Sequence, residues 1–123
     1  MKKMRKLLEA VNLYFEGIHE CDASKLKEVF HPKSSLFDAD NGKIFVETID
    51  SFIEDVSKRT SPASVGNEMK EEVLMIDYVS DISDTEKIRI HAHKNIFVDH
   101  LAFVRDTNDW KIVSKIWHLE NEQ

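Results

Sequence analysis

This sequence has little cysteine and glycine and lacks any long apolar run, and each shortage narrows what the protein can be. Cys21 is the only cysteine in 123 residues, so no disulfide can form within the chain, and we expect a reducing, cytoplasmic environment. Only three glycines are present, and none belongs to a phosphate-binding loop. No apolar run approaches the roughly 20 residues that span a bilayer, so we expect no membrane partner.

Positive charge is also in short supply. The 17 lysines and arginines are outnumbered by 23 aspartates and glutamates, which gives a net charge of −6. An acidic surface repels phosphates, so we expect no nucleic-acid partner. What is present is the composition of a folded protein, with 41% hydrophobic and 33% charged residues. We therefore predict one globular domain over residues 1–123.

Three segments carry apolar residues at three- and four-residue steps, which predicts three helices. The first covers residues 4–20. Asp22 is typical of an N-cap and predicts a short second helix, which must end before Pro32 because proline disfavours helical geometry in the residue before it. The third helix covers residues 47–58.

The remaining segments favour strands. A turn signal at Asp40-Asn41-Gly42 separates two short strands at 34–39 and 43–46. After residue 67 the apolar period changes to two and predicts four longer strands, at 68–79, 85–93, 96–105 and 110–119. The order of helices, a hairpin, a helix and then a meander predicts an α+β fold, with a curved antiparallel sheet packed against the N-terminal helices.

Pairing arithmetic assigns faces to the strands at 85–93 and 96–105. A two-residue turn at Lys94-Asn95 would place Ile90 opposite Asp99, and residues opposite one another share a face. One face then carries Ile88, Ile90, Ala92, Phe97, Asp99, Leu101 and Phe103. The other face carries Arg89, His91, His93, Val98 and His100. By composition the first set faces inward, which places the Asp99 carboxylate among apolar side chains.

The sequence constrains less well the phase of the last strand, that is, which of its side chains face inward. A two-residue turn at Thr107-Asn108 would pair Asp99 with Ile116 and turn His118 inward, diagonal to Asp99. A turn one residue longer would instead turn Lys115 and Trp117 inward, because a slip of one residue reverses every side chain. We favour the first phase because its inward set is the more apolar one: Trp110, Ile112, Ser114, Ile116 and His118.

Asp99 allows two interpretations. An ionised carboxylate in apolar surroundings is costly unless it is paired or protonated. Asp99 could lie at an edge or pair with His118 as part of the structure. It could equally be the polar group of an otherwise apolar ligand cavity.

Three histidines lie on the predicted outer face. His91, His93 and His100 could offer three ligands to zinc, with one coordination position left open. Because Arg89 shares this face and the face is the outer one, we favour an exposed or dimer-facing cluster. We accordingly predict no metal site and no cofactor.

Four segments resemble the nuclear transport factor 2-like superfamily, and within it a small family named putative lumazine-binding. They are Tyr14-Phe15-Glu16-Gly17-Ile18-His19, Val29-Phe30-His31-Pro32, Phe97-Val98-Asp99-His100-Leu101 and residues 110–118. The resemblance covers nearly the whole chain. It implies a helix-lined cone with a pocket, as in the related SnoaL-like families, and a homodimer formed through the sheet.

A narrower resemblance links three residues to ketosteroid isomerase. Tyr14, Asp38 and Asp99 align with the catalytic positions of that enzyme. There an aspartate moves a proton beside a carbonyl, while a tyrosine and a protonated aspartic acid stabilise the enolate oxygen. The flanking residues Phe37 and Ala39 depart from the isomerase pattern.

Three functions follow as hypotheses, and the sequence leaves open whether the protein is an enzyme. The first is a small-molecule-binding domain with an apolar pocket. Its ligand would contact Tyr14, Phe15, His31, Phe37, Phe97, Asp99, Leu101 and His118. The second is an isomerase-like or polyketide-cyclase-like enzyme with Tyr14, Asp38 and Asp99 as catalytic residues. The third is a non-catalytic dimeric interaction or accessory protein.

Overall fold

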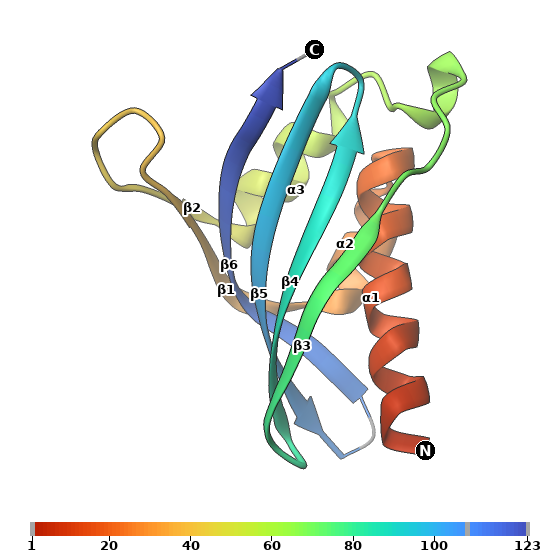
Figure 1. Ribbon diagram of the computed structural model, residues 1–123, viewed down its shortest axis with the longest axis vertical. Coiled ribbons are helices and arrows are strands. Elements are labelled where there is room, and N and C mark those ends of the chain that lie inside the picture. The colour runs from red at the N-terminus through yellow and green to blue at the C-terminus, as the bar shows by residue number, and fades with distance from the viewer. Residues whose placement is uncertain (1, 108, 123) are drawn as a thin grey trace.

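The computed structural model describes residues 2–107 and 109–122, in which three α-helices lie on one face of a six-stranded curved sheet (Figure 1). The helices are α1 (Lys2–Glu20), α2 (Ala23–Val29) and α3 (Ile49–Ser57), followed by a short 3-10 turn, η1 (Ala63–Val65). The strands are β1 (Phe30–Asp38), β2 (Phe45–Thr48), β3 (Glu72–Ser80), β4 (Ser83–Ala92), β5 (Asn95–Asp106) and β6 (Asp109–Glu122). The predicted α+β class is confirmed.

The sheet is mixed, with strand order β2-β1-β6-β5-β4-β3. All neighbouring pairs are antiparallel, as predicted, except β1 and β6, which run parallel. The exception arises because the chain leaves β1 through β2 and α3 and returns to it only after the β3–β5 meander. Among the described residues, no helix has both the length and the apolarity that a membrane crossing requires.

The first strand begins earlier than predicted. Helix α2 ends at Val29, and Phe30 already pairs with Ile112 of β6. The pairing is irregular between Phe30 and Ser35, where Pro32 has no N–H to donate. Within that gap, the Ser34 hydroxyl donates to the Ile112 carbonyl oxygen at 2.6 Å.

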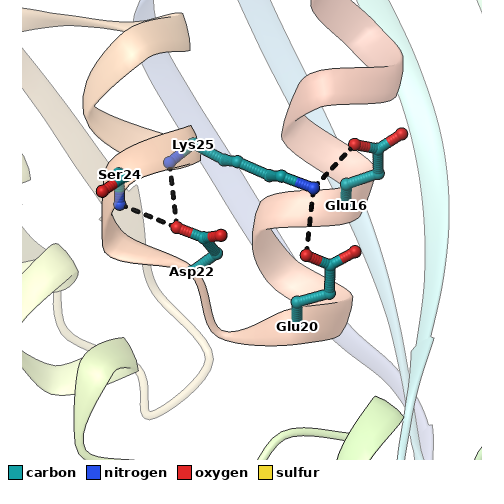
Figure 2. A network of polar contacts seen from close by, with 5 residues as sticks. All are labelled: Glu16, Glu20, Asp22, Ser24 and Lys25. Atoms are coloured by element: carbon teal, nitrogen blue, oxygen red, sulfur yellow. Dashed lines mark hydrogen bonds and ion pairs between the residues drawn. The ribbon is translucent and has the colours of Figure 1, made fainter.

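The junction of α1 and α2 is held by a polar network (Figure 2). The Asp22 carboxylate caps α2 as predicted, accepting from the backbone N–H of Ser24 at 2.9 Å and of Lys25 at 3.2 Å. The Lys25 ammonium reaches back to α1 and bridges Glu16 at 2.9 Å and Glu20 at 3.0 Å. The network fixes the angle at which α2 leaves α1.

Gly17 marks the closest approach of the two helices. A Cβ atom at this position would lie 2.7 Å from Cδ2 of Leu26, which is fully buried and has little room to move. Glycine inside a helix costs roughly 0.5–1 kcal/mol relative to alanine. The tight contact between α1 and α2 explains why a glycine stands here.

The face assignment for β4 and β5 is confirmed, although the turn lies one residue earlier than predicted. The turn residues are His93 and Lys94, so Ile88 rather than Ile90 lies opposite Asp99. A shift of two in the pairing preserves every face because the side-chain period is two. His93 is the exception, since it leaves the strand with a φ of 56° instead of joining His91 on the outer face.

The predicted phase of β6 is right for its first half and wrong for its second. Arg105 pairs with Trp110 as predicted, although the predicted turn residue Asn108 lies outside the described residues. Ala102 then pairs with Ser114 and Phe103 with Ile112, so Val113 is an extra residue on β6. This bulge reverses the side chains from Ser114 to Leu119, because each moves to the opposite face, and a second shift follows between the pairs Phe97–Leu119 and Ile96–Asn121.

His118 therefore does not face inward, and the prediction that it lies near Asp99 is wrong. Asp99 pairs with Trp117 instead, and Lys115 and Trp117 turn toward the helices. The His118 side chain is 66% exposed and places Nδ1 2.6 Å from Oδ1 of Asp40. Asp40 also accepts the Leu119 N–H at 3.0 Å, which ties the β1–β2 loop to the end of β6.

Candidate functional site

A cavity of about 150 Å³ lies between the helices and the inner face of the sheet, near the β4–β5 turn. It occupies the end of the cone where α1 and α3 finish, the upper end in Figure 1. Four aromatic rings line it: Tyr14, Phe52, Phe97 and Trp117. Four charged side chains also line it: Glu47, Arg59, Asp99 and Lys115.

The polar centre of the cavity joins three elements. The Tyr14 hydroxyl on α1 donates to Oδ2 of Asp99 on β5 at 2.6 Å. The Lys115 ammonium on β6 lies 3.6 Å from the same oxygen. All three side chains are buried, with Tyr14 at 0%, Asp99 at 2% and Lys115 at 6% exposure. The opposite charge and the hydroxyl together stabilise a carboxylate that would otherwise be costly to bury.

The second Asp99 oxygen is free. Both donors converge on Oδ2, while Oδ1 is buried and has no hydrogen-bond partner among the described residues. Buried carboxylate oxygens normally find donors, and an unmet acceptor costs about 1–3 kcal/mol. Because Asp99 lines the cavity, a donor brought in by a ligand would satisfy it.

Lys115 lies among aromatic rings. Its Nζ is 4.4 Å from the ring centre of Phe52, 5.3 Å from that of Tyr14 and 6.0 Å from that of Trp117. Burial lowers the pKa of Lys115 below its usual value, against the opposing effect of Asp99. Burial, followed by the nearby Asp99 charge, raises the pKa of the Tyr14 hydroxyl, which therefore stays protonated and donates.

Glu47 and Arg59 complete the charged lining. Glu47 is half-buried on β2, and its carboxylate accepts from the Ser51 hydroxyl at 2.9 Å. Burial raises the pKa of Glu47. Arg59, just beyond α3, is exposed and lies at the outer limit of the cavity.

A larger groove of about 510 Å³ adjoins the cavity. The two hollows share Ile18, Arg59, Ala92 and Phe97 in their linings. The groove therefore lies directly beside the cavity that contains Asp99. A ligand could therefore place a small group in the cavity and a larger one in the groove.

Three of the predicted ligand residues line the cavity, namely Tyr14, Phe97 and Asp99. Phe15 and Leu101 belong to the hydrophobic core behind it. The other three lie elsewhere: His31 and His118 are exposed, and Phe37 pairs with Ile116 on the outward side of the sheet.

The three predicted catalytic residues are only partly brought together. Tyr14 and Asp99 are in contact, whereas Asp38 is not among the residues that line the cavity. Asp38 lies at the end of β1, where its carboxylate accepts the Asp40 N–H at 3.4 Å. Its geometry is that of a residue entering the turn at 40–42.

Sequence reasoning missed Glu47, Phe52, Arg59, Lys115 and Trp117 as lining residues. The signal for Lys115 and Trp117 was present in the alternative phase of the last strand, which turns both of them inward. The bulge at Val113 produces that outcome without a longer turn.

Among the residues that the structure describes, no group of three histidine, cysteine, aspartate or glutamate side chains could hold a metal ion. The ring of His93 turns away from His91, with Nε2 2.9 Å from the Thr60 carbonyl oxygen. His100 lies on β5 opposite Lys87 and Ile116.

The site offers complementary polar groups in a mainly apolar setting. Asp99 presents a free acceptor, Lys115 presents a donor, and the rings provide flat apolar walls. Such an arrangement can bind a small flat molecule that carries a donor and an acceptor on one edge. An aspartate and a lysine in contact can also exchange protons with a bound molecule.

Residues 2–118 match a protein family described as "Putative lumazine-binding". A search of curated proteins gave no match. Among solved structures, a nuclear transport factor 2-like protein of unknown function from Shewanella baltica superposes with a TM-score of 0.86 at 21% identity, over 97% of this chain and 94% of that one. One from Silicibacter pomeroyi gives 0.83 at 18% identity, over 95% of each chain.

A third such protein, from Methylobacillus flagellatus, gives a TM-score of 0.79 at 18% identity, over 96% of this chain and 92% of that one. Its function is also unknown. At these identities the structural likeness establishes the fold alone.

Proposed function

Since the chain belongs to the putative lumazine-binding family, within the nuclear transport factor 2-like superfamily, we propose that it binds a small planar molecule in the cavity beside Asp99. One observation carries the proposal: Oδ1 of Asp99 is buried, lines the cavity and lacks a hydrogen-bond partner among the described residues. A bound ligand that donates a hydrogen bond would supply the missing partner.

The chemistry of the ligand follows from the neighbours of that oxygen. Asp99 accepts a hydrogen bond, and Lys115 donates one from the same side of the cavity. A heterocycle whose edge carries an N–H next to a carbonyl matches this pair. Lumazine, a pteridine with two ring carbonyls and ring N–H groups, has such an edge, and the aromatic walls suit its flat ring system.

The test is a thermal-shift and calorimetric titration with lumazine and with other flat heterocycles that carry an N–H beside a carbonyl. Lumazine methylated on its ring nitrogens keeps the shape but loses the donor. We expect the unmethylated compound to bind at least ~5-fold more tightly, because the methylated one leaves Oδ1 unpaired. At one hundred times its Kd, the ligand should raise the free energy of unfolding by about 2.7 kcal/mol.

Two variants make the test specific. Asp99→Asn should weaken binding, because an amide can offer an N–H where the ligand needs an acceptor. His118→Gln changes an exposed residue outside the cavity and should bind like the wild type. Failure of all these heterocycles to bind, or equal binding by Asp99→Asn, would overturn the proposal.

We also propose that the protein forms a homodimer through the outer face of the sheet. Val46, Phe37 and Ile116 are neighbours across three strands of that face, and Val46 and Ile116 are each 54% exposed. A second copy would cover these apolar side chains. Light scattering should report a dimer for the wild type and a monomer for Ile116→Lys, while Val65→Lys, on the distant η1 turn, should remain dimeric.

A second candidate function is proton transfer by an aspartate, favoured by the short hydrogen bond between Tyr14 and Asp99. Turnover of a Δ5-3-ketosteroid would support it, and Asp38→Asn and Asp99→Asn would show which aspartate takes part. Absence of turnover at high protein concentration would leave the binding function alone.

A further inference from the structure

Lys115 is the only buried lysine among those whose side chains the structure describes. A buried ammonium is normally held by a close carboxylate with short, charge-assisted hydrogen bonds of about 2.7–2.9 Å. The Lys115 nitrogen lies 3.6 Å from Oδ2 of Asp99, and that oxygen already accepts the Tyr14 hydroxyl at 2.6 Å. The nitrogen is thus near an acceptor without being bound closely to it.

Opposing effects act on the charge of the Lys115 nitrogen. The rings of Phe52 on α3 and Trp117 on β6 lie close enough to attract the ammonium. Burial lowers the pKa of Lys115, and the more distant Arg59 beyond α3 lowers it further. Asp99 on β5 and Glu47 on β2 oppose that shift without cancelling it.

The Lys115 side chain also forms part of the cavity wall, and the cavity adjoins the larger groove near Arg59. A small molecule bound in the cavity meets the amine and the Asp99 carboxylate together. Buried amines with apolar neighbours are the kind that act as nucleophiles toward carbonyl carbon.

We propose that Lys115 is a nucleophile that forms a Schiff base with small aldehydes and ketones bound in the cavity. This inference rests on the proposed function, since it requires the same cavity to admit a ligand. The amine lone pair adds to the carbonyl carbon as the C=O π bond breaks, and one N–H proton passes through Asp99 to the oxygen to give a carbinolamine. The second N–H proton passes through Asp99 to the hydroxyl, so the C–O bond breaks, one water leaves and a C=N bond remains.

The experiment uses two aldehydes, propanal and benzaldehyde, with sodium cyanoborohydride as the reductant that converts each imine into a stable secondary amine. Peptide mapping by mass spectrometry then measures the rate at which each lysine is modified at neutral pH. Lys43, which is exposed, serves as the reference within the same sample. We expect Lys115 to react several-fold faster than Lys43, because the cavity holds the aldehyde beside the Lys115 amine and Asp99.

Variants separate reactivity from mere accessibility. Lys115→Arg keeps the positive charge and cannot form an imine, so the fast adduct should disappear while slow modification of Lys43 continues. Lys115→Met gives the same information should the arginine variant fail to fold, which circular dichroism would show. In the wild type, prior unfolding in urea should bring the rate at Lys115 down to that at Lys43.

The outcomes distinguish this inference from the proposed function. If neither aldehyde modified Lys115 faster than Lys43, the Schiff-base proposal would be overturned. If lumazine still bound in that case, the binding function would stand without it. If no heterocycle bound and Lys115 were also unreactive, both proposals would fail.

Discussion

The inner face of the sheet carries buried ionisable groups at both ends, and the two sets differ in the charge of their neighbours. At the cavity end, Asp99 has a hydroxyl and an ammonium beside it. At the other end, under the first turns of α1, Asp84 and Glu86 lie two residues apart on β4 and are 1% and 0% exposed. Burial, followed by the proximity of Asp84, raises the pKa of Glu86 to about 9.

The difference separates the proposed binding site from a feature of the packed core. Asp99 lies beside a group of opposite charge at an open cavity, and one of its oxygens has no hydrogen-bond partner among the described residues. Two like charges in a packed core instead keep a proton on Glu86 at neutral pH. We therefore expect changes at the cavity end to alter binding, and changes at the Glu86 end to alter the pH dependence of stability.

The largest effect should come from removing the acceptor at the cavity end. Asp99→Leu leaves the Lys115 ammonium and the Tyr14 hydroxyl buried without their partner, and should lower the free energy of unfolding by about 3 kcal/mol. Urea unfolding at neutral pH measures the change. The double variant Asp99→Leu, Lys115→Met should recover much of the loss, and equal instability of single and double variants would contradict the pairing.

The next largest effect concerns the other end and depends on pH. The folded-state pKa of Glu86 is about 9, whereas its unfolded value is 4.5, so between these the folded state holds one more proton and stability falls as pH rises. From pH 6.5 to 8 the loss should be about 2 kcal/mol. Glu86→Gln mimics the protonated form and should make stability flatter over this range.

Two other groups also affect how stability depends on pH. Burial raises the pKa of Glu71 to about 7, so below that pH Glu71 also makes the free energy of unfolding fall as pH rises. The lowered pKa of Lys115 acts in the opposite direction, because its folded state loses the proton first. Glu71 and Lys115 are present in both the wild type and Glu86→Gln, so their contributions cancel when the two slopes are compared. Equal slopes for the two proteins would show that Glu86 does not hold the extra proton.

A smaller effect should follow from crowding the helices beside the cavity. Gly17→Ala would place its Cβ 2.7 Å from Leu26, and overpacking should outweigh the gain in helix propensity by about 1 kcal/mol. Thermal unfolding measures this loss. The double variant Gly17→Ala, Leu26→Val should lose less free energy of unfolding than the sum of the losses in the two single variants. Strictly additive losses would contradict the contact between residues 17 and 26.

The smallest effect is expected at His118. Its contact with Asp40 is a hydrogen bond at the surface, and His118→Gln should change the free energy of unfolding by less than about 0.5 kcal/mol. Ligand affinity should be unchanged, because His118 faces away from the cavity. A loss of binding in this variant would show that His118 takes part in ligand binding, and would contradict the assignment of inner and outer faces.

The sequence predicts the inner face of β4 and β5 well because face assignment needs only the parity of the pairing. The β4–β5 turn lies one residue earlier than predicted, yet Asp99 still shares a face with Ile88 and Leu101. The same alternation, continued back along β4 beyond Ile88, would have placed Glu86 and Asp84 inward.

The rest of the site could not be derived in this way. A β-bulge leaves no composition signal, so the extra residue Val113 could not be predicted, and the phase that turns Lys115 inward was the less favoured of the two. Glu47 and Arg59 reach the cavity from β2 and from beyond α3, and their approach depends on how the helix packs across the sheet. Such long-range packing is set by shape, which periodicity does not encode.

The central claim is that a ligand binds inside the cone, at the free oxygen of Asp99. The most direct test is an NMR titration of the 15N-labelled protein with lumazine, following backbone amides on both faces of the sheet. We predict shifts at Ala92, Phe97 and Trp117, which line the cavity, and their loss in Asp99→Asn. Shifts confined to the outer face around His100 and Ile116, or shifts that persist in Asp99→Asn, would contradict the account.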